Sequence, residues 1–431
     1  MLINFTVENF RSFRKEVSLR MEATNIKELS VSVFHADGLS LLPVAVIYGA
    51  NSSGKSNILQ AMSVMCYLVK TSSKMNPDES LHYDPFKLDL TSRKEPTKFE
   101  IVFLQKGIRY RYGFSYNEHQ ITEEYLFRVP VGKKSEEQLF LRAGDEYDIS
   151  DKYFDEGKNL ESKTLANRLF LTVAAQFNGK ISQDVMKCFA QLNSINGIEA
   201  AGYEGFTMEM FAERKSGYEQ ALKFFHDTQL GFNNLSIRQK ALTKDLLETL
   251  DHVPAEVKKD FIDEIQKGKV METLTTHDIK DDDGRKVGEE EFLESAMESE
   301  GTKKVIQMSG PIFDTLIHGK VLLIDELDAK LHPILTRHIV RLFMDPNINK
   351  HHAQLIFNTH DTNLLSKDNF RRDQIWFVEK DKADSTDLYS LVEFIDAQGK
   401  KVRNDSSYEK DYINGRYGAI PFIGGLEYEQ K

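Results

Sequence analysis

The chain has 431 residues, of which 40% are hydrophobic and 29% are charged, so it can bury the core of one large or two ordinary domains. Its formal net charge of −11 excludes a surface that wraps nucleic acid on all sides, because phosphate binding needs clustered lysine and arginine, but it leaves room for nucleic acid at a local basic groove. No apolar run approaches the roughly 20 residues that span a bilayer, and the first residues alternate as a strand does instead of forming a signal peptide, which predicts a cytoplasmic protein without membrane contact.

The first part of the chain predicts strands, then a buried strand and a helix. Apolar residues alternate from Leu2 to Val7, and a second extended run follows the turn at residues 9–12. Residues 43–48, "PVAVIY", form a short continuous apolar run, which indicates a strand buried on both faces of a parallel sheet. The segment that follows, "GKSNILQAMSVMCYLV", has the apolar spacing of a helix packed on that sheet.

Residues 97–142 have the alternating pattern of antiparallel strands. Two runs, "TKFEIVFL" and "IRYRYGFSY", are joined at Lys106 and Gly107, which predicts a hairpin. Two further runs, "ITEEYLFRV" and "QLFLR", extend the pattern. We therefore expect an antiparallel β lobe within residues 1–180.

From about residue 181 to residue 298 the pattern becomes helical and polar. Helical spacing occurs in "MEMFAERKSGYEQALKFFHD" and in "PAEVKKDFIDEIQK". The acidic run "THDIKDDDGRKVGEEEFLESAMESE" is expected to form a solvated loop that leads into a helix. We therefore expect an inserted helical lobe, which without sustained heptads is no long coiled-coil arm.

The last part of the chain returns to buried strands. We predict strands at "KVLLID", "AQLIFNT" and "QIWFVE", with a helix from about Pro333 to Met344 after the first of them. Residues 1–180 and 299–431 are therefore predicted to build one α/β domain around a parallel sheet, which the insert at 181–298 interrupts.

The segment "GANSSGKS", residues 49–56, matches the phosphate-loop pattern G-x-x-x-x-G-K-S/T after a buried strand and before a helix. Its glycines let the backbone wrap around phosphates, while the loop N–H groups and the helix N-terminus face the anion. Lys55 is expected to neutralise the β- and γ-phosphates, and Ser56 to offer its hydroxyl to Mg²⁺. The predicted nucleotide-binding residues of this loop are Gly49, Ala50, Asn51, Ser52, Ser53, Gly54, Lys55, Ser56 and Asn57.

The segment "VLLIDE", residues 321–326, is the expected second half of such a site. Asp325, at the end of a buried strand, is expected to bind Mg²⁺ directly or through water, and Glu326 to orient or deprotonate the attacking water. The 270 residues between Lys55 and Asp325 indicate that an insertion splits the nucleotide-binding core. His360, at the end of the next buried strand, can reach the γ-phosphate and sense its presence.

Five segments occur in one order along the chain: "NFRSF", "GANSSGKSN", "SEGT", "LLIDELDAKLHP" and "NTHD". Together they resemble the ABC-type ATPase heads of the RecF/SMC superfamily. More closely, they are similar to bacterial ATPases of the RloA and abortive-infection type, which include ATPase subunits of anti-phage systems such as AriA of PARIS. The closing "NGRYGAIPFIGG" is also similar to that subgroup, so the resemblance reaches both ends of the chain and is weakest across the insert.

The resemblance implies roles for further residues. Arg11 and Ser12 match a turn that approaches the nucleotide phosphates, and Asp328 matches the D-loop, which crosses the dimer interface. Gln176 stands, by order alone, where a Q-loop glutamine would couple Mg²⁺ to the helical lobe.

The segment "SEGTKKV" matches the Ser-x-Gly signature that ABC heads carry at the start of a helix, and Ser299 lies 26 residues ahead of Asp325. A serine hydroxyl, the close approach that Gly301 allows and the positive end of a helix make an anion site. In such heads this site closes over the γ-phosphate that a second subunit holds. The segment departs from the commoner Leu-Ser-Gly-Gly-Gln form, and the alternative is a plain N-cap serine.

The sequence thus predicts an ABC-type ATPase that binds MgATP at composite sites between two heads, hydrolyses it and moves the lobes that contact a partner. The resemblance implies defence against phage with a separately encoded effector, often a nuclease, as partner. The sequence does not exclude larger homo-oligomers built from such dimers. Three alternatives remain: a RecF-like ATPase that clamps DNA in repair, a nucleotide-gated scaffold with little turnover, and the energy subunit of a transporter.

Overall fold

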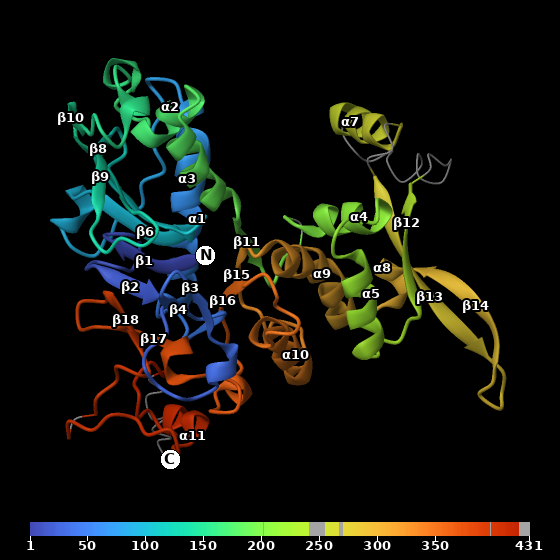
Figure 1. Ribbon diagram of the computed structural model, residues 1–431. Coiled ribbons are helices and arrows are strands. Elements are labelled where there is room, and N and C mark those ends of the chain that lie inside the picture. The colour runs from blue at the N-terminus through green and yellow to red at the C-terminus, as the bar shows by residue number, and fades with distance from the viewer. Residues whose placement is uncertain (201, 241–254, 267–269, 397, 422–431) are drawn as a thin grey trace, which may run out of the picture.

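The computed structural model describes residues 1–200, 202–240, 255–266, 270–396 and 398–421. Figure 1 shows a head that holds the labelled N-terminus and, near its other end, α11 (Tyr408–Ile413), and a lobe that projects from one side of it. The head is built on a seven-stranded and a six-stranded sheet, and the lobe carries a three-stranded sheet. In these ranges no helix has the length and apolar character needed to cross a bilayer.

The seven-stranded sheet is antiparallel throughout, in the order β10-β9-β8-β7-β6-β1-β2. Its strands are β1 Leu2–Glu8, β2 Val17–Arg20, β6 Thr97–Gln105, β7 Ile108–Tyr116, β8 Ile121–Val129, β9 Glu137–Ala143 and β10 Glu146–Ile149. Lys106 and Gly107, at φ 51° and 76°, form the turn between β6 and β7. The predicted antiparallel β lobe and its hairpin are confirmed.

The six-stranded sheet has the order β11-β15-β16-β5-β17-β18, and only its last pair is antiparallel. Its strands are β5 Val44–Gly49, β11 Leu192–Asn196, β15 Val321–Asp325, β16 Gln354–Asn358, β17 Ile375–Lys380 and β18 Thr386–Ser390. The two ends of the chain interleave here, because β5 lies between β16 and β17. β11 belongs to this sheet although it lies within the predicted insert, so the head takes in part of that range.

Helices cover both faces of the six-stranded sheet. α1 (Lys55–Thr71) lies between the two sheets of the head, where Ile58 and Met62 join Phe5, Phe99 and Tyr112 in one apolar core. The opposite face is covered by α9 Glu300–His318, α10 Pro333–Met344 and α11 Tyr408–Ile413. With both faces closed, a ligand can reach this sheet only at an edge, where the strands end.

Short elements complete the head. They are α2 Phe170–Gln176, α3 Lys180–Ala190, the strand pair β3 Phe34–Ala36 and β4 Leu39–Leu41, and the 3₁₀ turns η1 Ser30–Ser32, η2 Ser72–Lys74, η3 Ser92–Lys94, η4 Asp155–Gly157, η5 Glu161–Lys163, η6 Thr362–Leu364 and η7 Arg372–Gln374. α2 and α3 pack at the end of α1 that lies away from residue 55.

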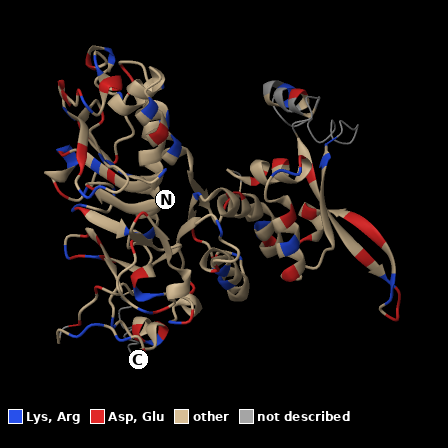
Figure 2. Ribbon diagram, viewed as in Figure 1, with Lys and Arg blue, Asp and Glu red and all other residues tan. Residues whose placement is uncertain are grey.

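The lobe is not purely helical, which corrects the prediction. Its elements are α4 Glu204–Ala212, α5 Tyr218–Asp227, β12 Asn234–Gln239, α7 Ala255–Gln266, β13 Met271–Lys280, β14 Lys286–Leu293 and α8 Glu294–Met297. The acidic run that was expected to be a loop forms the β13–β14 hairpin, which Figure 1 shows extending away from the head. Acidic residues lie along β14 (Figure 2), and both faces of this strand are largely exposed to solvent.

α9 contains Pro311 in its interior, and α4 packs against the turn of α9 that precedes this proline. Proline has no N–H, so the carbonyl oxygen of Gln307, one turn earlier, loses its helical donor. The hydroxyl of Thr207 on α4 donates a hydrogen bond to this oxygen instead. A Cβ on Gly310 would lie 2.4 Å from Thr207 Oγ1, so glycine is needed for this approach. The helix therefore runs through Pro311 as one element that is fastened to α4.

Thr207→Val is expected to loosen this contact, because it keeps the side-chain shape but removes the hydroxyl that donates to the partly buried Gln307 carbonyl oxygen. The free energy of local opening of α4 should fall by about 1–3 kcal/mol. Amide hydrogen exchange of α4 and α9 measures this change. Thr228→Val is the matched control, because the Thr228 hydroxyl bonds a carbonyl that its own N–H also reaches. Equal changes in the two variants would contradict the role of Thr207.

Candidate functional site

The carboxyl ends of three neighbouring parallel strands meet at one edge of the six-stranded sheet. Gly49 ends β5, Asp325 ends β15 and Asn358 ends β16. The register places Asn358 beside Ile47 and Phe357 beside Ile324, so the three ends are level. Ligands of open α/β sheets bind at this kind of edge.

The loop after β5 is shaped by two glycines. Gly54 has φ 106°, and a Cβ there would lie 2.6 Å from Thr386 Oγ1 and 2.7 Å from Ser12 Oγ. A Cβ on Gly49 would lie 2.6 Å from the carbonyl oxygen of Val378. Any larger residue would push the loop out of place, so the backbone can wrap closely around an anion only with glycine at both positions.

The loop is also tied to β18 and to the turn after β1. Thr386 Oγ1 donates a hydrogen bond to the carbonyl oxygen of Ser53 at 2.7 Å, and the Thr386 N–H donates to the carbonyl oxygen of Ser12 at 2.7 Å. Asn57 Nδ2 donates to Ser12 Oγ at 2.7 Å. The sequence predicted that Ser12 approaches the loop but gave no signal for Thr386, which is distant in the chain.

Arg11 lies in the same turn, with φ 49°. Its Nε donates to Asp84 Oδ2 at 2.9 Å, and its guanidinium also bonds the side-chain oxygen of Gln60 on α1. Arg11 thus lies beside the first turns of α1, where the predicted approach to phosphates would place it. Asp84, which the sequence analysis did not identify, holds it there.

Lys55, the first residue of α1, is 7% exposed and brings a cation to the loop. Its Nζ donates to two carbonyl oxygens of the loop, at 2.8 and 3.0 Å. Burial lowers the pKa of Lys55, and the carboxylates of Glu326, Asp325 and Asp328 raise that pKa in opposition. The structure therefore brings the predicted lysine and all three predicted acidic residues into one electrostatic site.

The oxygen atoms beside the loop fit a Mg²⁺–phosphate group. Ser53 Oγ is buried and has no hydrogen-bond partner in the described ranges. Ser56 follows Lys55 at the start of α1, and the Asp325 carboxylate accepts a hydrogen bond from Asn358 Nδ2. A hydroxyl and a carboxylate are the ligands that Mg²⁺ takes beside substrate phosphates and water, so Ser56 and Asp325 could hold this ion. Asn51 and Ser52 are exposed at the loop tip, where Ser52 has φ 62°.

Glu326 is held in the left-handed backbone region, at φ 56°. Its N–H donates to Asn358 Oδ1 at 2.6 Å, so a single amide side chain contacts both Asp325 and Glu326. A Cβ on Gly197 would lie 2.2 Å from the Glu326 carbonyl oxygen, so only glycine fits there. Sequence reasoning missed Asn358, although it lies inside the "NTHD" segment, and it missed Gly197 entirely.

His360 and Asp328 are neighbours at the same edge. The His360 N–H lies 3.3 Å from each Asp328 carboxylate oxygen and donates to them, and the His360 side chain is exposed. The predicted switch histidine and the predicted D-loop aspartate are therefore brought together, and Asp328 is also one of the carboxylates that raise the pKa of Lys55.

Ser299 caps α9, and its Oγ accepts the Thr302 N–H at 3.2 Å. A Cβ on Gly301 would lie 2.9 Å from the carbonyl oxygen of Lys330, and Glu300 pairs with the Lys330 amine at 3.0 Å. The predicted signature segment thus packs against the segment that follows Glu326. Ser299 is therefore the N-cap of α9, as the alternative predicted. This cap does not exclude the signature role, because Ser299 is exposed at the positive end of the helix.

Gln176 is not part of this assembly, which corrects its placement as a metal residue. It is the exposed last residue of α2. α2 contacts the turn after α1, where Ser72 Oγ lies 3.3 Å from Thr172 Oγ1. The 17 residues of α1 separate this end from the phosphate loop by about 25 Å, at about 1.5 Å per residue. Order along the chain indicated Gln176, but the fold carries it to the far end of the helix.

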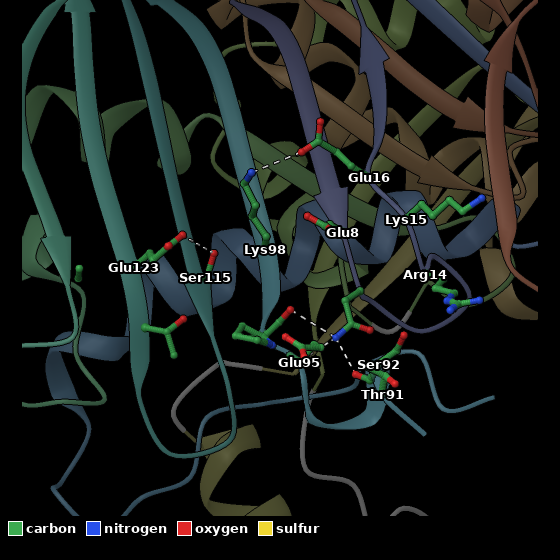
Figure 3. Close-up of a pocket in the computed structure, with 14 residues that line it drawn as sticks. Glu8, Arg14, Lys15, Glu16, Thr91, Ser92, Glu95, Lys98, Ser115 and Glu123 are labelled. Atoms are coloured by element: carbon green, nitrogen blue, oxygen red, sulfur yellow. Dashed lines mark hydrogen bonds and ion pairs between the residues drawn. The ribbon is translucent and has the colours of Figure 1, made fainter. Parts of the chain in front are cut away.

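A groove of about 860 Å³ lies elsewhere, on the outer face of the antiparallel sheet (Figure 3). Two hydrogen bonds lie within its lining: Lys98 Nζ donates to Glu16 at 3.4 Å, and Ser115 Oγ donates to Glu123 at 3.4 Å. Its charged residues are Arg14, Lys15, Lys98, Glu8, Glu16, Glu95 and Glu123. Because acids outnumber bases, this groove does not offer the positive field that phosphates need.

A family profile described as "AAA domain, putative AbiEii toxin, Type IV TA system" matches residues 44–366. The matched range begins with β5 and includes the phosphate loop, Asp325, Glu326 and His360. No protein of curated function matches the chain.

Similar solved structures include SMC heads. One, the "SMC head domain from Thermotoga maritima", is 14% identical, with 90% of this chain and 98% of that chain covered, at a TM-score of 0.40. An SmcHead bound to the C-winged helix domain of ScpA is 12% identical, with 90% and 97% covered, at a TM-score of 0.46. An Smc head with an extended coiled coil, bound to the C-terminal domain of ScpA derived from Pyrococcus furiosus, is 14% identical, with 90% and 96% covered, at a TM-score of 0.37. Likeness at this level carries no information about ligands or partners.

Proposed function

Because the chain belongs to the AAA-domain family whose profile spans residues 44–366, and is therefore a P-loop ATPase, we propose that it hydrolyses ATP at composite sites between two copies and so controls a partner effector. The observation that carries this proposal is the gathering of Lys55, Asp325, Glu326 and Asp328 beside a glycine-shaped loop at one sheet edge.

Each residue at this edge has a place in hydrolysis. The loop N–H groups and the α1 N-terminus bind the phosphates of ATP, and the Lys55 amine exchanges its loop carbonyls for phosphate oxygens. Mg²⁺, held by Ser56 and Asp325, would neutralise charge on the β- and γ-oxygens. Glu326 orients the attacking water for in-line displacement, and His360 senses the γ-phosphate.

A second copy completes the site. Ser299 and Gly301 lie at the positive start of α9, which packs against Lys330 in the segment that follows β15. The phosphate loop follows β5, and β5 lies two strands away from β15. About 10 Å separates strands two places apart, so another chain is better placed to bring this helix end over the phosphates. ATP then joins two heads, and hydrolysis separates them.

The biological role we propose is defence against phage, in the cytoplasm, with a separately encoded effector as partner. The description of the family, which names a toxin and a toxin–antitoxin system, supports a defence role over DNA repair. The acidic, exposed β13–β14 hairpin favours a protein partner over nucleic acid, because phosphates would be repelled there (Figure 2).

Ser299→Arg tests the composite site. The bulky cation should block closure, so that ATP-dependent dimerisation is lost and turnover falls about 100-fold or more, while a single chain still binds ATP. Light scattering with and without ATP, steady-state turnover and nucleotide titration measure the three quantities. Ser295→Arg, at an exposed position four residues earlier, is the matched control and should behave as wild type. Assembly and turnover that survive Ser299→Arg unchanged would refute the second-copy site.

A further inference from the structure

The Glu326 peptide is held from three sides. Its left-handed backbone, at φ 56°, is unusual for a residue with a side chain and is kept only where the surroundings enforce it. Asn358 holds the N–H side and Gly197 packs on the carbonyl side, as described above. The third contact comes from Lys304, on the first turns of α9.

The side chain of Lys304 is only 4% exposed, and its amine donates hydrogen bonds to the backbone of the segment after β15. Nζ donates to the carbonyl oxygens of Glu326 at 3.3 Å and Leu327 at 3.0 Å, and also to that of Ala329. A lysine ammonium has three donors, so its hydrogen-bonding capacity is fully used by this one segment.

The electrostatics show that this contact is costly. Burial lowers the pKa of Lys304 to about 8, against the Asp328 and Glu326 carboxylates, which raise it, while Lys330 lowers it further. In the described part of the chain Lys304 has no ion-paired carboxylate within 4.0 Å. A buried ammonium that bonds only carbonyl oxygens contributes little to stability, because its desolvation penalty is not offset by a paired charge.

We propose that Lys304 is a positioning residue for ATP hydrolysis, which fixes residues 326–329 so that Glu326 faces the phosphates and which ties α9 to the Glu326 of its own chain. This inference rests on the proposed function. Ser299 lies at the start of α9, five residues before Lys304, so closure of one copy's α9 over its partner's nucleotide is transmitted to its own Glu326. The two composite sites of a dimer are then coupled through Lys304.

The adjacent lysine provides a matched control. Lys303 donates to the carbonyl oxygen of Ser295 at 2.9 Å and pairs with Glu300 at 3.2 Å, and it does not contact residues 326–329. Lys303→Met removes the same charge from the same helix turn, so a difference between the two variants isolates the contact with the Glu326 segment.

Lys304→Met should lower kcat about 100-fold, because small misplacement of a reacting group has effects of this size. The affinity for ATP and ATP-dependent dimerisation should stay within about twofold of wild type, since the phosphate loop and Ser299 are untouched. Lys303→Met should keep kcat within about twofold. A second variant, Gly197→Ala, displaces the Glu326 carbonyl from its other side and should also lower kcat without changing ATP affinity.

The outcomes separate the inference from the proposed function. Loss of kcat in Lys304→Met and Gly197→Ala, with ATP affinity and dimerisation retained, supports a positioning role. Wild-type kcat in Lys304→Met would overturn it, as would a parallel loss of ATP affinity and dimerisation, which marks a structural role. If Ser299→Arg abolishes turnover while Lys304→Met does not, only the inference fails. If Ser299→Arg leaves turnover and assembly intact, the composite site fails whatever Lys304 does.

Discussion

Glu326→Gln is expected to lower ATP turnover by about 100- to 10,000-fold while ATP still binds, because the amide cannot accept a proton from the attacking water. The backbone contacts of this residue, from Asn358, Gly197 and Lys304, involve no carboxylate oxygen and so should survive the substitution. The ATP-bound state therefore persists, and dimers should accumulate with ATP. Steady-state turnover and light scattering in the presence of ATP measure both effects.

Glu379→Gln is the control for this experiment, because Glu379 is an exposed carboxylate near the end of β17 in the same sheet. Its turnover should stay within about twofold of wild type, as expected for an exposed surface charge. Normal turnover by Glu326→Gln would remove this residue from catalysis. Slow turnover by the wild-type chain itself, with ATP held between two copies, would instead favour the nucleotide-gated scaffold.

Lys55→Ala is expected to abolish measurable nucleotide binding, and with it turnover. Asp325, Glu326 and Asp328 face this amine, so its removal leaves three carboxylates to repel the phosphates of ATP. The affinity for ATP should fall about 100-fold or more. Titration with a fluorescent ATP analogue gives the affinity, and the melting temperature with and without ATP gives an independent measure.

Lys70→Ala, on an exposed site in the last turn of the same helix, is the control and should bind ATP as wild type does. Retained affinity in Lys55→Ala would mean that the loop after β5 does not hold the phosphates. Loss of affinity in both variants would point to damage of α1 and not to the missing charge.

The sequence predicted the head well where burial has a simple period. Strands buried on both faces, such as β5 and β15, appear as continuous apolar runs, and the helix at 333–344 was placed at its observed bounds. The hairpin β13–β14 was missed because β14 exposes both faces, so its consecutive acids show no alternation. Charge along that run indicated solvent correctly, but it carried no information about backbone pairing.

The candidate site was predictable only where one short motif places a residue. Lys55, Asp325 and Glu326 belong to such motifs. Gly197 and Thr386 lie outside any such motif. Lys304 lies in the segment "SEGTKKV", but the Ser-x-Gly pattern there assigns a role only to Ser299 and Gly301. Each of the three missed residues contacts a backbone carbonyl oxygen that is distant in sequence. Every residue carries a backbone carbonyl group, so the sequence contains no pattern from which a contact with one particular carbonyl could be predicted. The prediction that Gln176 takes part in the metal site was wrong for a related reason, because the order of residues along a chain does not determine their distance in space.

The interleaved order of the six-stranded sheet has a consequence for how the chain acquires its structure during synthesis. β5 pairs with β16 and β17, which leave the ribosome about 300 residues later. Until these strands have been synthesised, both edges of β5 lack their native hydrogen-bond partners. Sheets with long-range parallel pairing form slowly, and their unpaired strands are prone to aggregate until the pairing is complete. The antiparallel sheet can close much earlier and shield one side of α1. Expression at low temperature or with added chaperones should therefore raise the yield of native protein, and a chain cut before Gln354 should aggregate.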